Sequence, residues 1–331
     1  MLKRAWPWLR ALIGVAILAI VVWRVGTGPF LDGLRVVNVP SVLAALGITL
    51  LTTVASAYRW RAVAHELGLA LTMRRAVADY YRALFLNVVL PAGVLGDVQR
   101  AVQHGRQSRD VGRGVRAVVL ERTGGQIVLI ALSVVVLLAQ PSVASTVVGD
   151  VATSPAAAIL AGIIVLAVVV AAVTLWRGGS TSRWRTAVGT TLADLRAGLL
   201  SRRTWPVVVL VSALVLAGHV SLFLVSAYTA DTHASVARLL TPIILTLLAS
   251  GLPINFGGWG PRESVSVLAF QVAGLGATQG LTVAVLYGVL TFVGSLPGAV
   301  VLVARMWSGR RAQVQLEERV VAEPEPADRN A

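Results

Sequence analysis

Cysteine is absent from the 331 residues of this chain, and charged residues are scarce. Without cysteine there can be no disulfide, thiolate metal ligand or cysteine nucleophile. The four histidines are scattered, without the spacing of a metal site. Only 13% of the residues are charged, with 15 acidic residues against 29 basic ones. The sequence therefore predicts no metal centre and no other cofactor.

Sequence motifs for catalysis are missing as well. The chain contains no GxSxG elbow, no Walker A loop, no HExxH helix and no constellation of paired carboxylates. Within the apolar stretches, only Glu263 beside Arg262 is a candidate for acid–base chemistry. A single carboxylate of this kind does not make an active site, so we expect that the protein is not an enzyme.

Long apolar runs account for most of the sequence, in which 56% of the residues are hydrophobic and the mean hydropathy is +0.78. Six of these runs approach the roughly 20 residues that a helix needs to cross a bilayer core. They are residues 11–23, 42–58, 117–138, 156–175, 205–227 and 281–304. Because the backbone in lipid must satisfy its own hydrogen bonds, such runs form helices. The expected fold is an all-α polytopic membrane protein with about six full transmembrane helices.

The net charge of +14 would suggest nucleic-acid binding in a soluble protein. Here the arginines gather in loops, where they set the orientation of a membrane protein by remaining in the cytoplasm. The basic stretches 59–75, 98–116 and 176–204 are therefore expected inside, and the stretches 140–155 and 228–238 outside. This assignment predicts a multi-pass protein of the cell membrane with both termini in the cytoplasm, and no nucleic-acid partner.

Two further apolar stretches, 76–95 and 239–256, are too short or too interrupted for an ordinary crossing. Stretches of this kind form re-entrant segments or broken helices. The residues that follow them, 98–105 and 264–276, could return the chain to the same side. Residues 1–307 are expected to form the membrane domain, and the polar, acidic residues 308–331 a disordered cytoplasmic tail.

Each interrupted stretch ends in a similar motif, which reads LPAGVLGDVQR at 90–100 and LPINFGGWGPRE at 252–263. When Pro91 is aligned with Pro253, the motifs also share a leucine, a glycine and an arginine. Three predicted crossings separate the two motifs, so their topologies are opposite. Inverted repeats with broken helices at matching positions are typical of the substrate site of a transporter.

The chemistry of these motifs favours a phosphate group. Proline ends a helix and glycine frees the backbone, so N–H groups and a new helix N-terminus become available to an anion. Arginine adds a planar fork that binds phosphate through two hydrogen bonds. The predicted substrate-binding residues are Asn87, Pro91, Gly93, Gly96, Asp97, Arg100, Glu121, Arg122, Asn255, Gly257, Gly258, Trp259, Gly260, Arg262 and Glu263.

An arginine at membrane depth is costly unless it faces a cavity or a partner. Asp97 is the expected partner of Arg100, and Glu263 that of Arg262. The alternative is that both arginines lie in helix-end loops and extend to the lipid headgroups.

Other candidate residues also have structural explanations. Glu121 and Arg122 could instead form an interfacial salt bridge, and Trp259 could stack on a ligand or pack at a hairpin tip. The segment Arg59-Trp60-Arg61 is interpreted as an anchor at the membrane interface.

Three segments together resemble a known family. They are LFLNVVLP at 84–91 with GDVQR at 96–100, then ERTGG at 121–125, then the motif at 252–263. In this order they resemble the integral membrane family typified by the N-terminal flippase domain of bacterial lysylphosphatidylglycerol synthases, which is also found as stand-alone proteins. The resemblance covers roughly residues 1–305 and implies a lipid-translocating membrane domain. The aminoacyl-transferase domain of those synthases does not follow in this sequence, so lysyl transfer is not implied.

The hypothesis favoured by the sequence is a flippase-like transporter that moves a phosphate-bearing lipid across the cytoplasmic membrane. The expected partners are membrane lipids, either an anionic phospholipid or a lipid linked through polyprenyl phosphate. The alternative is a non-transporting membrane subunit that supports a partner enzyme, a glycosyltransferase or a lipid synthase. A transporter of soluble anions is a third hypothesis.

Overall fold

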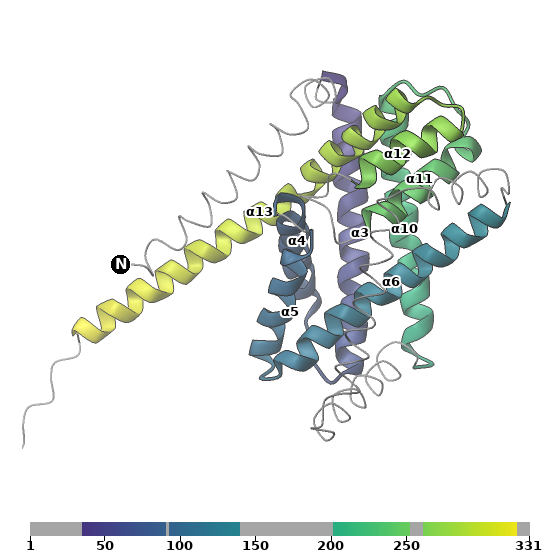
Figure 1. Ribbon diagram of the computed structural model, residues 1–331. Coiled ribbons are helices and arrows are strands. Elements are labelled where there is room, and N and C mark those ends of the chain that lie inside the picture. Colours follow the sequence, from purple (N-terminus) through teal and green to yellow (C-terminus); the bar gives the residue numbers. More distant parts are fainter. Residues whose placement is uncertain (1–34, 91–92, 140–200, 252–260, 323–331) are drawn as a thin grey trace, which may run out of the picture.

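The structure is a computed structural model that describes residues 35–90, 93–139, 201–251 and 261–322, with side chains as far as Trp307 in the last range (Figure 1). All the regular structure in these ranges is helical. The elements are α3 (Val39–Glu66), α4 (Met73–Val89), α5 (Leu95–Gln107), α6 (Val111–Ala139), α10 (Thr204–Thr229), α11 (Val236–Ser250), α12 (Pro261–Val272) and α13 (Ala277–Ala322).

Four of these helices, α3, α6, α10 and α13 as far as Trp307, are long and apolar enough to cross a membrane. Each contains one of the six predicted apolar runs, so four of these runs are confirmed as helices of membrane-spanning length. The other two, 11–23 and 156–175, lie outside the described residues. The chain is thus an all-α polytopic membrane protein.

The same order of helices occurs twice along the chain. A long helix, two short helices and another long helix form α3–α4–α5–α6, and the order recurs in α10–α11–α12–α13. The first short helix of each pair, α4 or α11, covers most of an interrupted stretch, and the second, α5 or α12, covers the residues that follow it. In each pair the two helices pack against each other. Figure 1 shows the α4–α5 pair at the lower end of α3 and the α11–α12 pair near its upper end. The two hairpins therefore approach the middle of the protein from opposite ends.

Helix α3 lies at the centre of the molecule and packs against α4, α6, α10 and α13. It begins with a capping box, in which Asn38 Oδ1 accepts a hydrogen bond from the Ser41 backbone N–H at 2.9 Å and Ser41 Oγ bonds the Asn38 N–H. This reciprocal bonding satisfies two backbone donors that a helix start leaves free.

Two buried apolar clusters surround the interior of the bundle. One is built around Trp60 and Ala117, at the end where α3, α4, α5 and α6 meet. The other is built around Phe223, Leu239 and Tyr287, where α10, α11 and α13 meet. The polar side chains described below lie against these two clusters.

The α4–α5 hairpin is held closed by its own residues. A Cβ atom added to Gly96 would lie 2.1 Å from the carbonyl oxygen of Ala83, so only glycine permits this close approach of the two helices. The Gly96 N–H donates to Asn87 Oδ1 at 2.8 Å, which bonds the start of α5 to the end of α4. Gly93, between the two helices, has a φ of +59°, a conformation that glycine adopts readily.

Helix α13 is shared by the two hairpins, because it packs against both α4 and α12. A Cβ atom added to Gly298 would lie 2.1 Å from the carbonyl oxygen of Tyr81, so this glycine lets α13 contact the backbone of α4. The helix continues to Ala322, whereas the sequence predicts disorder from residue 308. Alanine, glutamine, glutamate and arginine are frequent in 311–322 and have high helix propensity.

Candidate functional site

Five charged side chains gather where α3, α5 and α6 meet. This buried charge cluster consists of Arg59 from α3, Asp97 and Arg100 from α5, and Glu121 and Arg122 from α6. Charges in such a position require partners, because transfer from water to a low-dielectric interior costs several kcal/mol per ion. The cluster meets this requirement by alternating arginines and carboxylates.

Glu121 is the centre of the cluster and is completely buried. Its Oε1 accepts hydrogen bonds from Arg59 at 3.0 Å and 2.5 Å, and from the Tyr80 hydroxyl at 3.2 Å. Its Oε2 accepts from Arg100 Nη2 at 2.7 Å. One carboxylate thus binds two guanidinium groups from two different helices.

Arg100 connects Glu121 to Asp97 and is only 1% exposed. Its Nε donates to Asp97 Oδ1 at 2.8 Å. The aromatic rings of Tyr80 and Trp60 cover the guanidinium, with ring centroids 4.3 Å and 4.7 Å from its central carbon. The third nitrogen, Nη1, has no hydrogen-bond partner among the residues that the structure describes. Arg100 is thus fixed by two carboxylates and two aromatic rings.

Asp97 connects the hairpin tip to α6. Its Oδ2 accepts from Arg122 Nη2 at 2.5 Å and from the Asn87 amide at 2.9 Å. Burial by itself would raise the pKa of Asp97, but the neighbouring guanidiniums of Arg122 and Arg100 lower this pKa to about 2. The carboxylate is therefore ionised at any physiological pH.

The expected pairs Asp97–Arg100 and Glu263–Arg262 are both confirmed, the second with a nitrogen–oxygen distance of 2.5 Å. Glu121 and Arg122, in contrast, bind different partners: Glu121 pairs with Arg59 and Arg100, and Arg122 pairs with Asp97, so the alternative of a salt bridge between the two is wrong. Adjacent residues of a helix point in directions about 100° apart and do not face each other.

The interpretation of Arg59-Trp60-Arg61 as an interface anchor is wrong for its first two residues. Arg59 and Trp60 are 4% and 0% exposed, and Arg59 Nη1 donates to Ser212 of α10 at 2.7 Å. A signal in the sequence would have indicated this. Thr49, Thr52, Ser56 and Arg59 recur at the spacing of one helix face, and the structure buries all four.

The arginine of the second motif, Arg262, lies in a different environment. It pairs with Glu263 and lies over the ring of Tyr287, 5.4 Å from the ring centroid. The Tyr287 hydroxyl is 3.0 Å from Nδ1 of His219, and Phe223 stacks on the tyrosine ring with centroids 4.3 Å apart. The two motif arginines thus occupy two sites with different neighbours.

The structure places nine of the fifteen predicted substrate-binding residues. It brings Asn87, Gly96, Asp97, Arg100, Glu121 and Arg122 together, with Gly93 at the nearby hairpin tip, and it pairs Arg262 with Glu263. The remaining six lie outside the described residues, and they are Pro91, Asn255, Gly257, Gly258, Trp259 and Gly260. A substrate contact by any of the fifteen remains a prediction.

The buried charge cluster contains three guanidiniums and two carboxylates, which leaves one positive charge without a carboxylate in the cluster. The most accessible member is Arg122, whose side chain is 45% exposed. An anion could reach this arginine while the others remain covered. In the described part of the chain, no group of histidines and carboxylates is arranged to hold a metal ion.

Comparison with known proteins gives one result for this arrangement. The family model of the lysylphosphatidylglycerol synthase TM region matches residues 8–298. No curated protein and no solved structure gives a significant match. The matched range includes all five members of the buried charge cluster and both hairpins. The chain therefore belongs to the family of lysylphosphatidylglycerol synthase transmembrane regions.

Proposed function

We propose that this protein is a flippase-like transporter that moves a phosphate-bearing lipid across the cell membrane, and that it is not an enzyme. The observation that carries the proposal is the buried charge cluster, with its one excess positive charge and its accessible Arg122. A cation at membrane depth marks a path for a substrate or an ion unless a partner neutralises it. A lipid phosphate supplies the missing negative charge.

The position of the cluster suits this role. Asp97 and Arg100 lie in the first two turns of α5, directly after the tip of the α4–α5 hairpin. Broken helices of this kind hold the substrate of many transporters near the middle of the bilayer. The lipid headgroup would bind at Arg122, and its acyl chains would remain in the surrounding membrane.

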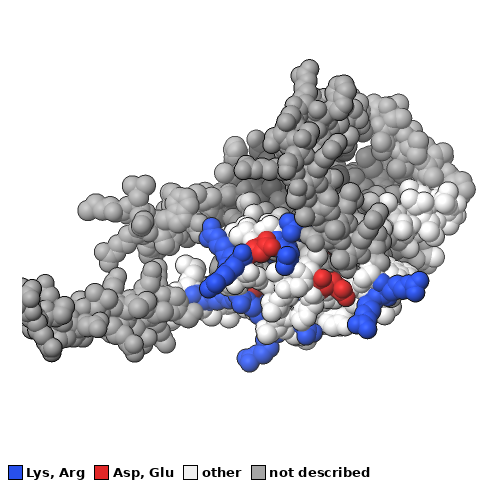
Figure 2. Space-filling model, turned by 90° about the horizontal axis from the view of Figure 1, so that it is seen from below, with Lys and Arg blue, Asp and Glu red and all other residues white. Residues whose placement is uncertain are grey.

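The distribution of charge also supports an orientation. The end of α5 and the starts of α6 and α10 lie at the lower end in Figure 1, and Figure 2 shows several Lys or Arg side chains on the face seen from below. Since basic residues are retained in the cytoplasm, this end is assigned to the cytoplasmic side.

The geometry favours Arg122 over Arg100 and Arg262 as the residue that first contacts the phosphate. Arg100 is enclosed by two carboxylates and two aromatic rings, and Arg262 is 6% exposed and already neutralised by Glu263. Arg122 has one carboxylate partner, Asp97, and a side chain that is 45% exposed. Binding at Arg262 would follow only when the pair with Glu263 opens.

Lipid flipping in reconstituted vesicles tests the proposal. Vesicles that contain a fluorescent phosphatidylglycerol in both leaflets are treated with dithionite, which bleaches only the outer leaflet. The wild-type protein should expose the inner pool faster than protein-free vesicles do. Arg122→Gln should lower the rate about tenfold or more, because a charge-assisted hydrogen bond is lost. Arg202→Gln removes the same charge from an exposed position and serves as the matched control.

The outcomes separate the hypotheses. The transport proposal fails if the lipid fluorescence in vesicles with the wild-type protein is bleached no faster than in protein-free vesicles under any ion gradient. A subunit that supports a glycosyltransferase or lipid synthase then becomes the better explanation. If the wild type flips lipid and Arg122→Gln flips it equally well, the protein is a transporter but its phosphate site lies elsewhere. Inhibition by inorganic phosphate alone would indicate a transporter of soluble anions.

A further inference from the structure

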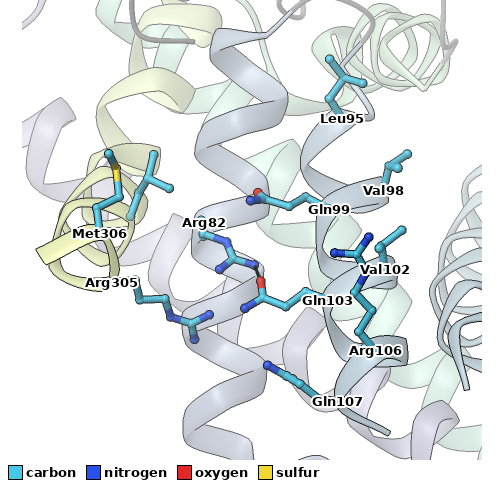
Figure 3. A pocket seen from close by; sticks show the side chains of 11 residues that line it. Arg82, Leu95, Val98, Gln99, Val102, Gln103, Arg106, Gln107, Arg305 and Met306 are labelled. Carbon is cyan, nitrogen blue, oxygen red and sulfur yellow. Dashed lines mark hydrogen bonds between the residues drawn. The ribbon is translucent and has the colours of Figure 1, made fainter. Parts of the chain in front are cut away.

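A second polar site lies outside the buried charge cluster, in a groove of about 730 Å³ between α4, α5 and α13 (Figure 3). This volume falls within the range of roughly 300–1,000 Å³ that is usual for ligand sites. None of the five members of the buried charge cluster lines the groove. The amphipathic groove, as we name it, is therefore a separate site.

One part of the groove is polar. Gln99, Gln103 and Gln107 recur every fourth residue on α5, and Figure 3 shows them extending from α5 toward α4 and α13. Arg82 of α4 donates a hydrogen bond to Gln103, and Arg305 of α13 lies on the opposite side. Amides and guanidiniums at this spacing match the several acceptor oxygens of a phosphate ester.

The other part of the groove is apolar. Leu95, Val98 and Val102 line it from α5, and Leu302 and Met306 from α13. Leu95, Val98 and Met306 are each about half exposed, since 43%, 53% and 44% of their surfaces remain accessible. An exposed apolar surface next to a cationic one suits a molecule with both characters.

The cations of the groove outnumber the anions among the described residues. Arg82 and Arg305 line the groove and share one carboxylate beside it, that of Asp79, at 3.4 Å and 2.5 Å. Arg106 lines the groove as a further cation. This one carboxylate does not balance the three guanidiniums that line the groove, so an added negative charge is favourable there.

A buried donor also lacks a partner at this site. Arg82 is 3% exposed, lines the groove, and its Nε has no hydrogen-bond partner in the described ranges of the chain. An unsatisfied buried donor costs about 1–3 kcal/mol, and more when it is charged. A ligand with an anionic oxygen in the groove would supply the missing acceptor.

We propose that the amphipathic groove binds one anionic phospholipid, with its phosphate against Arg82, Arg106 and Arg305 and an acyl chain over Leu95 and Val98. The polar part recognises the phosphate, and the apolar part selects a lipid over a free phosphate ion. Zwitterionic lipids bind less well, because their ammonium group meets the surplus of arginines. This binding does not depend on the proposed transport.

The absence of cysteine permits a local measurement. A single cysteine placed by Leu95→Cys carries a bimane fluorophore at the apolar end of the groove. The labelled full-length protein is reconstituted into lipid nanodiscs that contain a fixed fraction of brominated phosphatidylglycerol or brominated phosphatidylcholine. Bromine quenches bimane fluorescence only at short range, so a brominated acyl chain bound in the groove lowers the fluorescence. The expected result is stronger quenching by the anionic lipid.

Two substitutions and two controls then test the phosphate end. Arg106→Gln removes a charge, and Gln99→Glu adds an opposing one on the same helix, so each should weaken the preference for the anionic lipid roughly tenfold. Arg202→Gln, outside the groove, should leave the preference unchanged. Arg122→Gln should also leave it unchanged even if flipping stops, which distinguishes this proposal from the proposed function.

Three results would overturn the inference. Equal quenching by the two brominated lipids would show that the bimane senses only the bulk membrane. If the preference for the anionic lipid persists in both Arg106→Gln and Gln99→Glu, the lipid is recognised by another surface. Loss of the preference on addition of millimolar inorganic phosphate at constant ionic strength would identify a site for a soluble anion, not for a lipid.

Discussion

The central position of Glu121 leads to a quantitative prediction about stability. This carboxylate is completely buried and is the one that Arg59 contacts among the described residues. Glu121→Gln preserves the size of the side chain but removes its charge. Arg100 still has the carboxylate of Asp97, whereas Arg59 is left, among the described residues, with neutral acceptors, the glutamine amide oxygen and the hydroxyl of Ser212. Leaving one buried charge without its partner costs about 3–5 kcal/mol, and we expect a loss of that size in the free energy of unfolding.

The measurement is reversible unfolding of the purified protein in mixed micelles. Glu66→Gln is the matched control, since Glu66 lies exposed at the end of the same helix as Arg59, and it should change the free energy of unfolding by no more than about 0.5 kcal/mol. The double variant Arg59→Gln/Glu121→Gln should be more stable than the sum of its two single variants implies, by about 1–3 kcal/mol, because it contains no uncompensated arginine at this position.

The reasoning is refuted if Glu121→Gln unfolds at the same denaturant concentration as Glu66→Gln. The same conclusion follows if the effects of the two cluster substitutions simply add. Either result would mean that water or another group solvates Arg59 as well as the carboxylate does. The pairing of Arg59 with Glu121 would then contribute little to stability.

Three further predictions concern packing, pH and topology. Gly298→Ala should lower the free energy of unfolding by about 1–3 kcal/mol, because its methyl group would overlap a backbone carbonyl of α4, whereas Gly47→Ala, where an added Cβ meets nothing within 4 Å, should not destabilise. Because the pKa of Asp97 is lower in the folded protein, its contribution to stability is complete above its unfolded pKa of about 4 and is lost as the pH falls toward 2. Ionisation of Asp97 should therefore cause no change in the unfolding curves between pH 8 and pH 5. The prediction is contradicted if the free energy of unfolding changes near neutral pH and this change is missing in Asp97→Asn. In intact cells, an impermeant maleimide should label a cysteine at His233, in the loop before α11, but not one at Gln107, at the end of α5; the reverse pattern would invert the assigned orientation.

The hydropathy of the sequence and the positions of proline were enough to predict most of the fold. The long apolar helices that the structure describes coincide with predicted apolar runs. Each interrupted stretch forms one short helix and the residues after it form a second, because neither stretch provides the roughly 20 apolar residues of a full crossing. The pairing of Asp97 with Arg100 was predictable since it occurs within one helical turn.

The partners of Glu121 were not predictable in the same way. Its bonds to Arg59 and Arg100 span 62 and 21 residues, and a single sequence carries no record of which distant helix faces meet. Arg59 also adjoins a tryptophan, a combination that usually marks the membrane interface. Packing of α3 against α6 and α10 overrode this local pattern and buried both residues.

The ion pair between Asp79 and Arg305 has a consequence for the order of events during synthesis. These residues are separated by 226 positions, so the ribosome releases the α4–α5 hairpin long before α13 exists. Until then Asp79 has no arginine from α13, and Gly298 is not yet available to cover the backbone of α4. A nascent chain arrested before residue 298 should therefore hold its first hairpin in a loose state that a membrane protease can reach. The last helix to leave the ribosome completes the half of the protein that was made first.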